Sequence, residues 1–536
     1  MPKNGYFKAE GLSIGWVGKI RNNRNFGIIG QSRVLPTKSF KIFIIMLNKP
    51  EEFYIRLKKV EELRKIGIEP YEYKFQKEYT AKELKEKFDE LKEKTIKFAG
   101  RLMTVRIMGK SLFANLRDET DDIQIYIKTG ETENPFNTEN TAKAFDKFFD
   151  IGDIVGVEGY LFKTHTGEIT IFVKKFKMLS KCLLPLADKW HGLKDIETQY
   201  RERYLHLIVD KNAIETFKKK SQIIKLTRKF FEDNGFIEID TPTLQPIYGG
   251  ANANPFETYS NALETKLYLR IANELYLKRL IVGGFEKVYE ITKNFRNEGI
   301  DRTHYPEFIA MEAYAAYWDY YDMMELAENY LYFLVKNLFN SDEIIYEGRV
   351  ISFKLPFKRI SYIEELKNAL GFNPIEADLE FLKEKVEKYI QNVEKLHKWK
   401  IIDKLFDELI GKNLIEPTIV MDHPIEISPL AKIHRKFKDR VERFEIYLAG
   451  FEIANAFSEL NDPIEQRRRF EEQIKLRNLS NDKELPEEID EDFLNALEYG
   501  MPPTGGIGFG IDRICMILLN KPSIRDIIPF PQLKSK

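Results

Sequence analysis

A stretch of fourteen residues, FRNEGIDRTHYPEF at positions 295–308, gathers side chains that could hold a charged ligand. The overlapping segments KVYEITKNFRNE and EFIAMEAYAAY predict an antiparallel hairpin with a long loop. Period two places Arg296 and Glu298 on one face of the first strand, and Phe308, Glu312 and Tyr314 on one face of the second. Such groups are costly to bury without a partner, so convergence of the two faces would indicate a ligand site. A solvated hairpin face is the alternative, which the aromatic residues among the charges disfavour.

A second group of candidate residues lies in ERFEIYLAGFEIANAFSELNDP, residues 442–463. Asn455, Phe457 and Glu459 share one face of a predicted strand, and Glu445 lies on the strand before it. Glu452 is out of phase with Asn455, so a bulge or turn must intervene if both serve one site. Two nearby glutamates suit Mg²⁺, which takes one or two carboxylates and completes its shell with phosphate and water. Taken alone, the pattern favours a solvated acid pair.

The third group, GGIGFGIDRICMILLN at 505–520, places glycines before an apolar stretch that predicts a buried helix with Arg513 in its first turn. A glycine-rich approach to a helix N-terminus can bind an anion, and the arginine strengthens that site for phosphate. No strand–turn–helix unit with an acid about 20 residues later follows, which excludes the dinucleotide fingerprint. The P-loop pattern is excluded because it does not occur in the sequence.

Residues 95–182 carry five short strand-like segments, with a helical insert, NTAKAFDKFFD, before the fourth. In IQIYIK, Ile123, Ile125 and Ile127 share one face. This order predicts a small Greek-key barrel of the OB type, which commonly binds oligonucleotides. An outward row would offer an aromatic ring for stacking and polar groups for base edges, namely Arg106, Phe113, Gln124 and Glu168. The pattern alone favours an ordinary solvated sheet face.

The composition is that of a globular chain, with 536 residues, 43% apolar, 31% charged and zero net charge. No apolar run approaches the roughly 20 residues that span a bilayer. Cys182 and Cys515 form no CxxC pair, so we expect a reducing compartment, with the cytoplasm as the default. Residues 1–45 carry eight Lys/Arg and one acid, as an organelle-targeting leader would. A disordered extension, or a true start at Met46, is the favoured explanation.

Together the three groups resemble the motifs of class II aminoacyl-tRNA synthetases. GFIEIDTPTLQPI resembles motif 1, FRNEG with HYPEF resembles motif 2, and GIGFGIDR resembles motif 3. Agreement in GGANANPFET, EISPLAK and EIANAFSELNDP points to the lysyl-tRNA synthetase family, from about residue 50 to the C-terminus. The resemblance implies an α+β multidomain chain with an OB-fold β-barrel and a catalytic domain whose antiparallel sheet is flanked by helices. The expected segments are a basic extension at 1–48, a helical segment at 49–94, the anticodon-binding OB domain at 95–182, a linker at 183–199 and the class II catalytic domain at 200–536.

The resemblance also implies how ATP is held. Arg296 would bind the amino acid carboxylate and the α-phosphate, and His304 and Arg513 would bind the β- and γ-phosphates. No protein nucleophile is needed, because the substrate carboxylate attacks phosphorus itself. Arg296, His304 and Arg513 would thus be the catalytic residues. The implied ATP site comprises Arg296, Glu298, His304, Tyr305, Phe308, Glu445 and Arg513, with Phe308 and Arg513 around adenine and Mg²⁺ at Glu445 and Glu452.

A lysine substrate has two ammonium groups, so its pocket should be rich in carboxylates. By resemblance, Glu274 near Gly250 would meet the α-amino group. The ε-ammonium would meet Glu312, Tyr314 and Glu459, and the rest of the implied lysine site is Arg296, Asn455 and Phe457. In the barrel, Phe113 would stack on the central anticodon base of tRNA(Lys), with Arg106, Gln124 and Glu168 reading base edges.

Two alternatives remain open. One is an aspartyl- or asparaginyl-type synthetase, which Glu274 and Glu459 disfavour. The other is a synthetase-like protein that modifies another protein or acts as a non-catalytic regulator. The family further implies a homodimer formed through motif 1, around Pro242. Two positions depart from the family pattern, since Tyr305 replaces an asparagine close to ATP and Asn273 replaces a proline beside Glu274.

Overall fold

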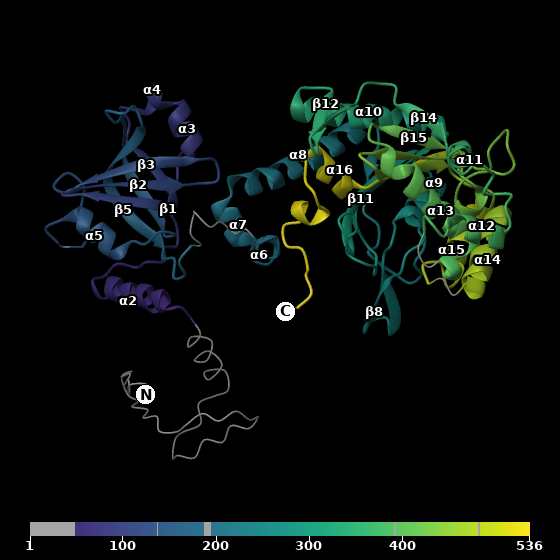
Figure 1. Cartoon of the computed structure of the whole chain (residues 1–536). Coiled ribbons are helices and arrows are strands. Elements are labelled where there is room, and N and C mark those ends of the chain that lie inside the picture. The colour runs from purple at the N-terminus through teal and green to yellow at the C-terminus, as the bar shows by residue number, and fades with distance from the viewer. Residues whose placement is uncertain (1–48, 137, 187–194, 391–392, 481–482, 536) are drawn as a thin grey trace, which may run out of the picture. The chain divides into compact units, whose positions relative to one another are not determined.

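The computed structural model describes residues 49–136, 138–186, 195–390, 393–480 and 483–535 (Figure 1). The predicted basic extension at 1–48 and residues 187–194 of the predicted linker lie outside the described residues. The chain divides into two compact units, Met1–Leu186 and Ala187–Lys536. In the described part of the chain, no helix is long and apolar enough to cross a membrane.

The first unit contains the predicted five-stranded barrel. Its strands close in the order β1-β2-β3-β5-β4, with helix α5 between β3 and β4 as the sequence predicts. Ile123, Ile125 and Ile127 of β3 point into the core and are at most 1% exposed. The OB-type fold is therefore confirmed. The elements are α2 (Glu51–Lys65), α3 (Ala81–Glu86), α4 (Phe88–Leu91), β1 (Ile96–Met108), β2 (Ser111–Arg117), β3 (Asp122–Lys128), α5 (Thr141–Phe148), β4 (Ile154–Lys163) and β5 (Ile169–Ser180).

The second unit is built on an eight-stranded sheet in the order β14-β15-β16-β17-β18-β11-β10-β6. Its inner strands pair antiparallel, and only the outermost pairs, β14 with β15 and β10 with β6, are parallel. The expected antiparallel class II sheet is thus present. The strands are β6 (Ile237–Glu238), β10 (Lys287–Phe295), β11 (Glu307–Ala316), β14 (Lys358–Ser361), β15 (Thr418–Met421), β16 (Arg443–Leu448), β17 (Phe451–Ser458) and β18 (Thr504–Phe509).

Helices α8 (Lys211–Asp233), α10 (Tyr320–Phe339) and α16 (Ile511–Leu518) join this sheet in the largest hydrophobic core. Phe231 of α8, Tyr330 of α10 and Ile514 of α16 are fully buried there. Full burial of such a side chain contributes roughly 1.5–3 kcal/mol to the stability of the fold. Packing of the three helices therefore holds the sheet in place. The remaining elements are α6 (Ile196–Arg201), α7 (Arg203–Val209), α9 (Glu274–Val282), α11 (Tyr362–Leu370), α12 (Leu379–Val386), α13 (Lys398–Leu409), α14 (Pro463–Ser480), α15 (Glu491–Glu498), β7 (Leu244–Gln245), β8 (Phe256–Ser260), β9 (Thr265–Leu269), β12 (Glu343–Tyr346) and β13 (Arg349–Ser352).

Candidate active site

The glycines at 505–510 do lead into a buried helix, as predicted, but most of them lie in a strand: β18 ends at Phe509, and Gly510 is the residue before α16. Gly505, Gly506 and Gly508 lie within β18, between β11 and β17, and α16 begins only at Ile511. A Cβ on Gly506 would lie 1.9 Å from a carboxylate oxygen of Glu459 and 2.6 Å from the ring of Tyr314. Only glycine fits at position 506, because the side chains of Glu459 and Tyr314 occupy the space that a Cβ would need. Arg513 does lie in the first turn of α16, as predicted.

A cavity of about 380 Å³ opens over β18 and the strands beside it. This volume is within the usual range for a small-molecule site. Its wall contains most of the predicted substrate residues, namely Gly250, Glu274, Arg296, Glu298, His304, Tyr305, Phe308, Glu312, Tyr314, Glu452, Asn455, Phe457, Glu459 and Arg513. Glu445 is not among the residues of the wall. Segments more than 250 positions apart in the sequence thus meet in one space.

Cationic side chains gather at one part of the cavity. The guanidinium of Arg296 lies 5.1 Å from the ring centre of Phe308, and its Nε is buried without a hydrogen-bond partner among the described residues. His304 Nε2 lies 3.1 Å from a terminal nitrogen of Arg513, and its Nδ1 lies 2.8 Å from Asp301. Burial lowers the pKa of Arg296, which means that its positive charge is poorly solvated. This cluster can take an anion such as a phosphate.

Acidic side chains form a second part of the wall. Glu274 and Glu459 are buried, and the hydroxyl of Tyr314 donates to Glu312 at 3.0 Å. Burial, with the charge of Glu274 adding to it, raises the pKa of Glu312 to about 8. Burial also raises the pKa of Glu459 well above its ordinary value. Carboxylates that resist ionisation alone favour a cationic ligand, which restores their charge.

Lys278 was not predicted from the sequence. Its side chain is fully buried, and Nζ pairs with Glu274 at 2.5 Å and with Glu459. The spacing of four residues between Glu274 and Lys278 on α9 is a signal that sequence analysis could have used. The contact with Glu459 has no such signal, because Glu459 follows β17 and is far from Lys278 in the sequence.

Gly250, and the two residues that depart from the family pattern, Asn273 and Tyr305, lie beside the cavity and support its wall. Gly250 has φ +83°, and a Cβ there would lie 3.1 Å from Cβ of Glu274, so glycine allows the close approach. Asn273 donates to Glu290 at 2.8 Å, and Glu290 also pairs with Arg270. Tyr305 is buried in the main core, and its hydroxyl accepts a bond of 2.5 Å from the backbone of Gln532. Both departures therefore anchor segments beside the cavity.

Glu445 and Glu452 are brought together by a bulge, as the sequence analysis required. The register of β16 and β17 shifts between Ile446 and Tyr447, so that Glu445 faces Asn455 and Tyr447 faces Glu452. Burial and the charge of Glu445 raise the pKa of Glu452 to about 7. Arg443, which was not predicted, donates to Asn455 at 2.9 Å and pairs with Glu445 at 2.5 Å. The repulsion between the two glutamates is one that a bound cation would relieve.

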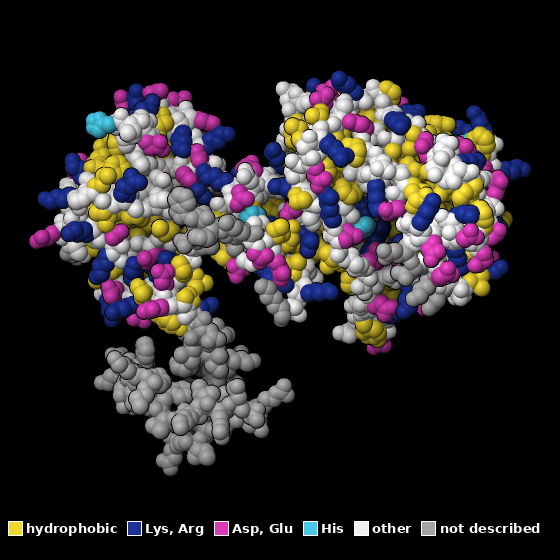
Figure 2. Space-filling view, in the orientation of Figure 1, with side chains coloured by type: hydrophobic (Ala, Val, Ile, Leu, Met, Phe, Trp, Pro, Cys, Tyr) yellow, Lys and Arg dark blue, Asp and Glu magenta, His cyan; other side chains and the backbone are white. Residues whose placement is uncertain are grey.

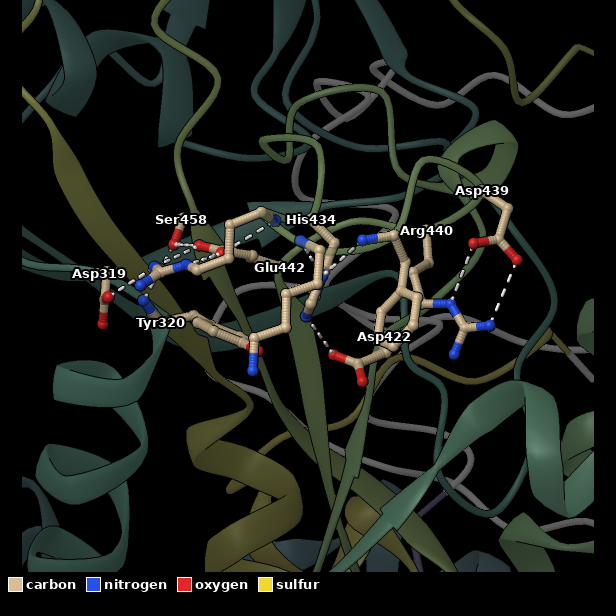
Figure 3. A network of polar contacts seen from close by, with 11 residues as sticks. Asp319, Tyr320, Asp422, His434, Asp439, Arg440, Glu442 and Ser458 are labelled. Carbon is tan, nitrogen blue, oxygen red and sulfur yellow. Dashed lines mark hydrogen bonds and ion pairs between the residues drawn. The ribbon is translucent and has the colours of Figure 1, made fainter.

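A polar network supports Glu459 through its neighbour Ser458 (Figure 3). The hydroxyl of Ser458 donates to Glu442 at 2.7 Å and accepts from the backbone of Tyr320 at 3.0 Å. Arg435 donates to Glu442 at 2.9 Å and to Asp319 at 2.7 Å. The network links the residue before β16, the end of β17 and the start of α10, and it fixes the backbone from which Glu459 extends.

Three of the four predicted barrel residues share one face of the sheet. Phe113 of β2 lies opposite Arg106 of β1 and Tyr126 of β3, and Gln124 lies two residues from Tyr126. The ring centres of Phe113 and Tyr126 are 4.6 Å apart, so the surface for stacking contains two aromatic rings, of which only Phe113 was predicted. Glu168 immediately precedes β5, which begins at Ile169. On the face of the molecule seen in Figure 2, basic and acidic side chains are interspersed over both units.

Two families match the chain, one for each unit. Residues 195–534 match the family described as "tRNA synthetases class II (D, K and N)". Residues 96–179 match the "OB-fold nucleic acid binding domain" family. The fold and the cavity thus belong to a class II tRNA synthetase that carries an OB-fold domain.

The relatives narrow this assignment. The chain is 49% identical to "Lysine--tRNA ligase" of Thermotoga maritima over 487 residues, 90% of this chain and 95% of the relative. It is 47% identical to the protein of the same name from Carboxydothermus hydrogenoformans over 489 residues, 90% of this chain and 98% of the relative. The chain belongs to the lysine–tRNA ligase family of class II synthetases.

Proposed function

We propose that the chain activates L-lysine with ATP to form lysyl-adenylate and transfers the lysyl group to the 3′ end of tRNA(Lys), releasing diphosphate and AMP. The observation that carries this proposal is one cavity whose wall holds Arg296, His304 and Arg513 as well as Glu274, Glu312 and Glu459. The cations suit the phosphates of ATP, and the acids suit the two ammonium groups of lysine.

In the activation step, an oxygen of the lysine carboxylate attacks the α-phosphorus, and the bond to the diphosphate oxygen breaks. Arg296 would hold the carboxylate and the α-phosphate, where charge develops in the transition state. His304 and Arg513, 3.1 Å apart, would hold the departing diphosphate. Catalysis then comes from positioning and electrostatic stabilisation, without a protein nucleophile.

The same proposal includes Mg²⁺ at Glu445 and Glu452. Burial, with the charge of Glu445 adding to it, raises the pKa of Glu452 to about 7, and a divalent cation at this position would favour the charged carboxylate. Two carboxylates are sufficient when ATP phosphates and water supply the other ligands. When bound, the ion would neutralise phosphate charge.

The decisive test is diphosphate exchange into ATP, measured with each of the twenty amino acids. We expect lysine alone to support rapid exchange, followed by charging of purified tRNA(Lys). Exchange with aspartate or asparagine in place of lysine would overturn the assignment of the pocket. Lysine-dependent exchange without tRNA charging would instead indicate a protein that modifies another acceptor.

We expect lysine binding to release protons near neutral pH. In the empty pocket Glu312 is protonated below about pH 8, whereas its unfolded value is near 4.5. An ammonium group beside Glu312 favours the charged carboxylate and lowers the pKa of Glu312. Between pH 4.5 and pH 8, lysine binding therefore releases protons, and lysine binds more tightly as the pH rises. By the same linkage, the raised pKa of Glu312 means that its protonation stabilises the folded chain without ligand at low pH. This contribution to stability is lost as the pH rises towards 8.

Titration calorimetry in two buffers with different ionisation enthalpies measures the release. The number of protons released at pH 7 should be smaller for Glu312→Gln than for the unchanged chain. Equal heats in both buffers for the unchanged chain would contradict this assignment of Glu312.

The OB barrel is proposed to bind the tRNA(Lys) anticodon through Arg106, Phe113, Gln124 and Glu168. Stacking of one base on an aromatic ring contributes about 1–3 kcal/mol. Phe113→Ala should therefore raise the KM for tRNA by roughly 10-fold in aminoacylation and leave ATP–diphosphate exchange within twofold. Tyr73→Ala, a fully exposed tyrosine of the same unit, is the matched control and should change neither. Loss of exchange in Phe113→Ala would indicate a structural role.

A homodimer formed through the segment around Pro242 is also part of the proposal. Ile237 lies on β6, an edge of the eight-stranded sheet, and is 52% exposed; Leu244 lies on β7, an edge of the three-stranded sheet, and is 47% exposed. Apolar side chains on an uncovered sheet edge favour association with another chain.

We also propose that the protein acts in the cytoplasm, because the proposed substrates ATP and tRNA are present there.

A further inference from the structure

Lys278 lies behind the acidic wall of the cavity. Its neighbours Glu274, Glu459 and Phe457 line the cavity, whereas Lys278 itself does not. Its Nζ nevertheless pairs with both carboxylates and lies 5.3 Å from the ring centre of Phe457. The ammonium is thus enclosed by groups whose other sides face the ligand.

Glu459 keeps its capacity to accept hydrogen bonds. It is 1% exposed, and although Lys278 is its ion partner, neither oxygen accepts a well-aligned hydrogen bond from the described residues. A buried carboxylate in this condition favours a second cation that can donate to it. The wall is therefore built for an ammonium beyond that of Lys278.

We infer that Lys278 is a positioning residue for the amino acid: from behind the wall it holds the carboxylates of Glu274 and Glu459 and sets the number of negative charges that the substrate must pair. This inference rests on the proposed function. Glu274, Glu312 and Glu459 act on one another electrostatically. Once the ammonium groups of the substrate restore the charges of these three carboxylates, Lys278 offsets one of them. Two remain, which equals the number of ammonium groups on lysine.

The surroundings keep Lys278 charged. Burial opposes the charge, yet Glu274 and Glu459 outweigh it and raise the pKa of Lys278. Among the other charged or titratable groups that act on this cluster are Glu312 and Tyr314 from β11, Glu290 from β10 and Arg443 from β16. Lys278 lowers the pKa values of both glutamates, which burial raises. Without Lys278 these values would rise further, and the substrate would have to displace a proton that is held more tightly.

The test is Lys278→Met, which keeps a long apolar side chain and removes the charge. In lysine-dependent exchange we expect the KM for lysine to rise about 10- to 100-fold, with the KM for ATP and kcat each within threefold. Lys278→Gln, which still donates to a carboxylate, should give a smaller increase and serves if the methionine variant does not fold.

Lys181→Met is the matched control. Lys181 is equally buried and also pairs with two acids, Asp150 and Asp153, but in the barrel unit. Its loss should leave the KM for lysine unchanged. An unchanged KM for lysine in folded Lys278 variants, or a parallel rise in both KM values, would overturn the role of Lys278. Absence of lysine-dependent exchange in the unchanged chain would instead overturn the proposed function.

Discussion

Glu459→Gln should lower kcat/KM for lysine by about 10²- to 10³-fold while the KM for ATP stays within threefold. Glu459 is fully buried in the acidic wall, where an ion pair that loses one partner costs roughly 3–5 kcal/mol. The amide can still accept a hydrogen bond, but it cannot balance the charge of the substrate ammonium. Steady-state exchange kinetics with lysine and ATP varied separately measure the two effects.

The control for this substitution is Glu328→Gln. Glu328 is also a buried glutamate of the second unit, but it accepts from the backbone of Phe357 at 2.8 Å, and it is not part of the cavity wall. We expect its KM for lysine to stay within twofold even if the protein is less stable. Equal losses for lysine and ATP in Glu459→Gln would mean that this residue does not face the side chain of the substrate.

Local periodicity predicted the parts of the site that depend on local geometry. Alternation was sufficient for the hairpin of β10 and β11, where Phe308 pairs with Asn294 and Glu312 with Glu290. It was wrong in placing Arg296 and Glu298 on the first strand, because β10 ends at Phe295. The phase conflict between Glu452 and Asn455 was sufficient to require a bulge, and β17 has one. These features follow from the strand period of two, which is a property of neighbouring residues.

The glycines of β18 could not be understood in that way. Glycine is unfavourable inside a strand, so local rules did not predict that GGIGFG is one and treated it only as the approach to a helix. Gly506 is present because Glu459 and Tyr314, from the two flanking strands, pass over it. The burial of Lys278 could not be predicted for the same reason, because its second ion-pair partner, Glu459, lies 181 positions away in the sequence. Both features depend on contacts between distant segments.

These two features also explain each other. Gly506 leaves room for the carboxylate of Glu459, and Lys278 holds that carboxylate from behind the wall. The network of Ser458, Glu442 and Arg435 fixes the adjacent backbone. Glu459 is thus held by its neighbours before any ligand arrives, and such preorganisation reduces the cost of ordering the site on binding.

Arg296→Ala should reduce the kcat of lysine-dependent exchange by about 10³-fold. Arg296 is proposed to bind the carboxylate and the α-phosphate, and removing one preorganised donor from a developing charge typically costs about 10²- to 10³-fold in kcat. Here the same side chain would bind two groups, so we expect the upper value. Arg296→Lys should recover little of the activity, because an ammonium cannot form the paired hydrogen bonds of a guanidinium.

The matched control is Arg302→Ala in the same loop. Arg302 pairs with Glu347 and donates to the hydroxyl of Tyr346 at 3.0 Å, and it is not a residue of the cavity wall. Its loss removes a cation from the same segment and should leave exchange within threefold. Comparable losses in both variants would show that the loop needs its arginines for folding. A folded Arg296→Ala variant with more than about a tenth of the original kcat would exclude Arg296 from the chemical step.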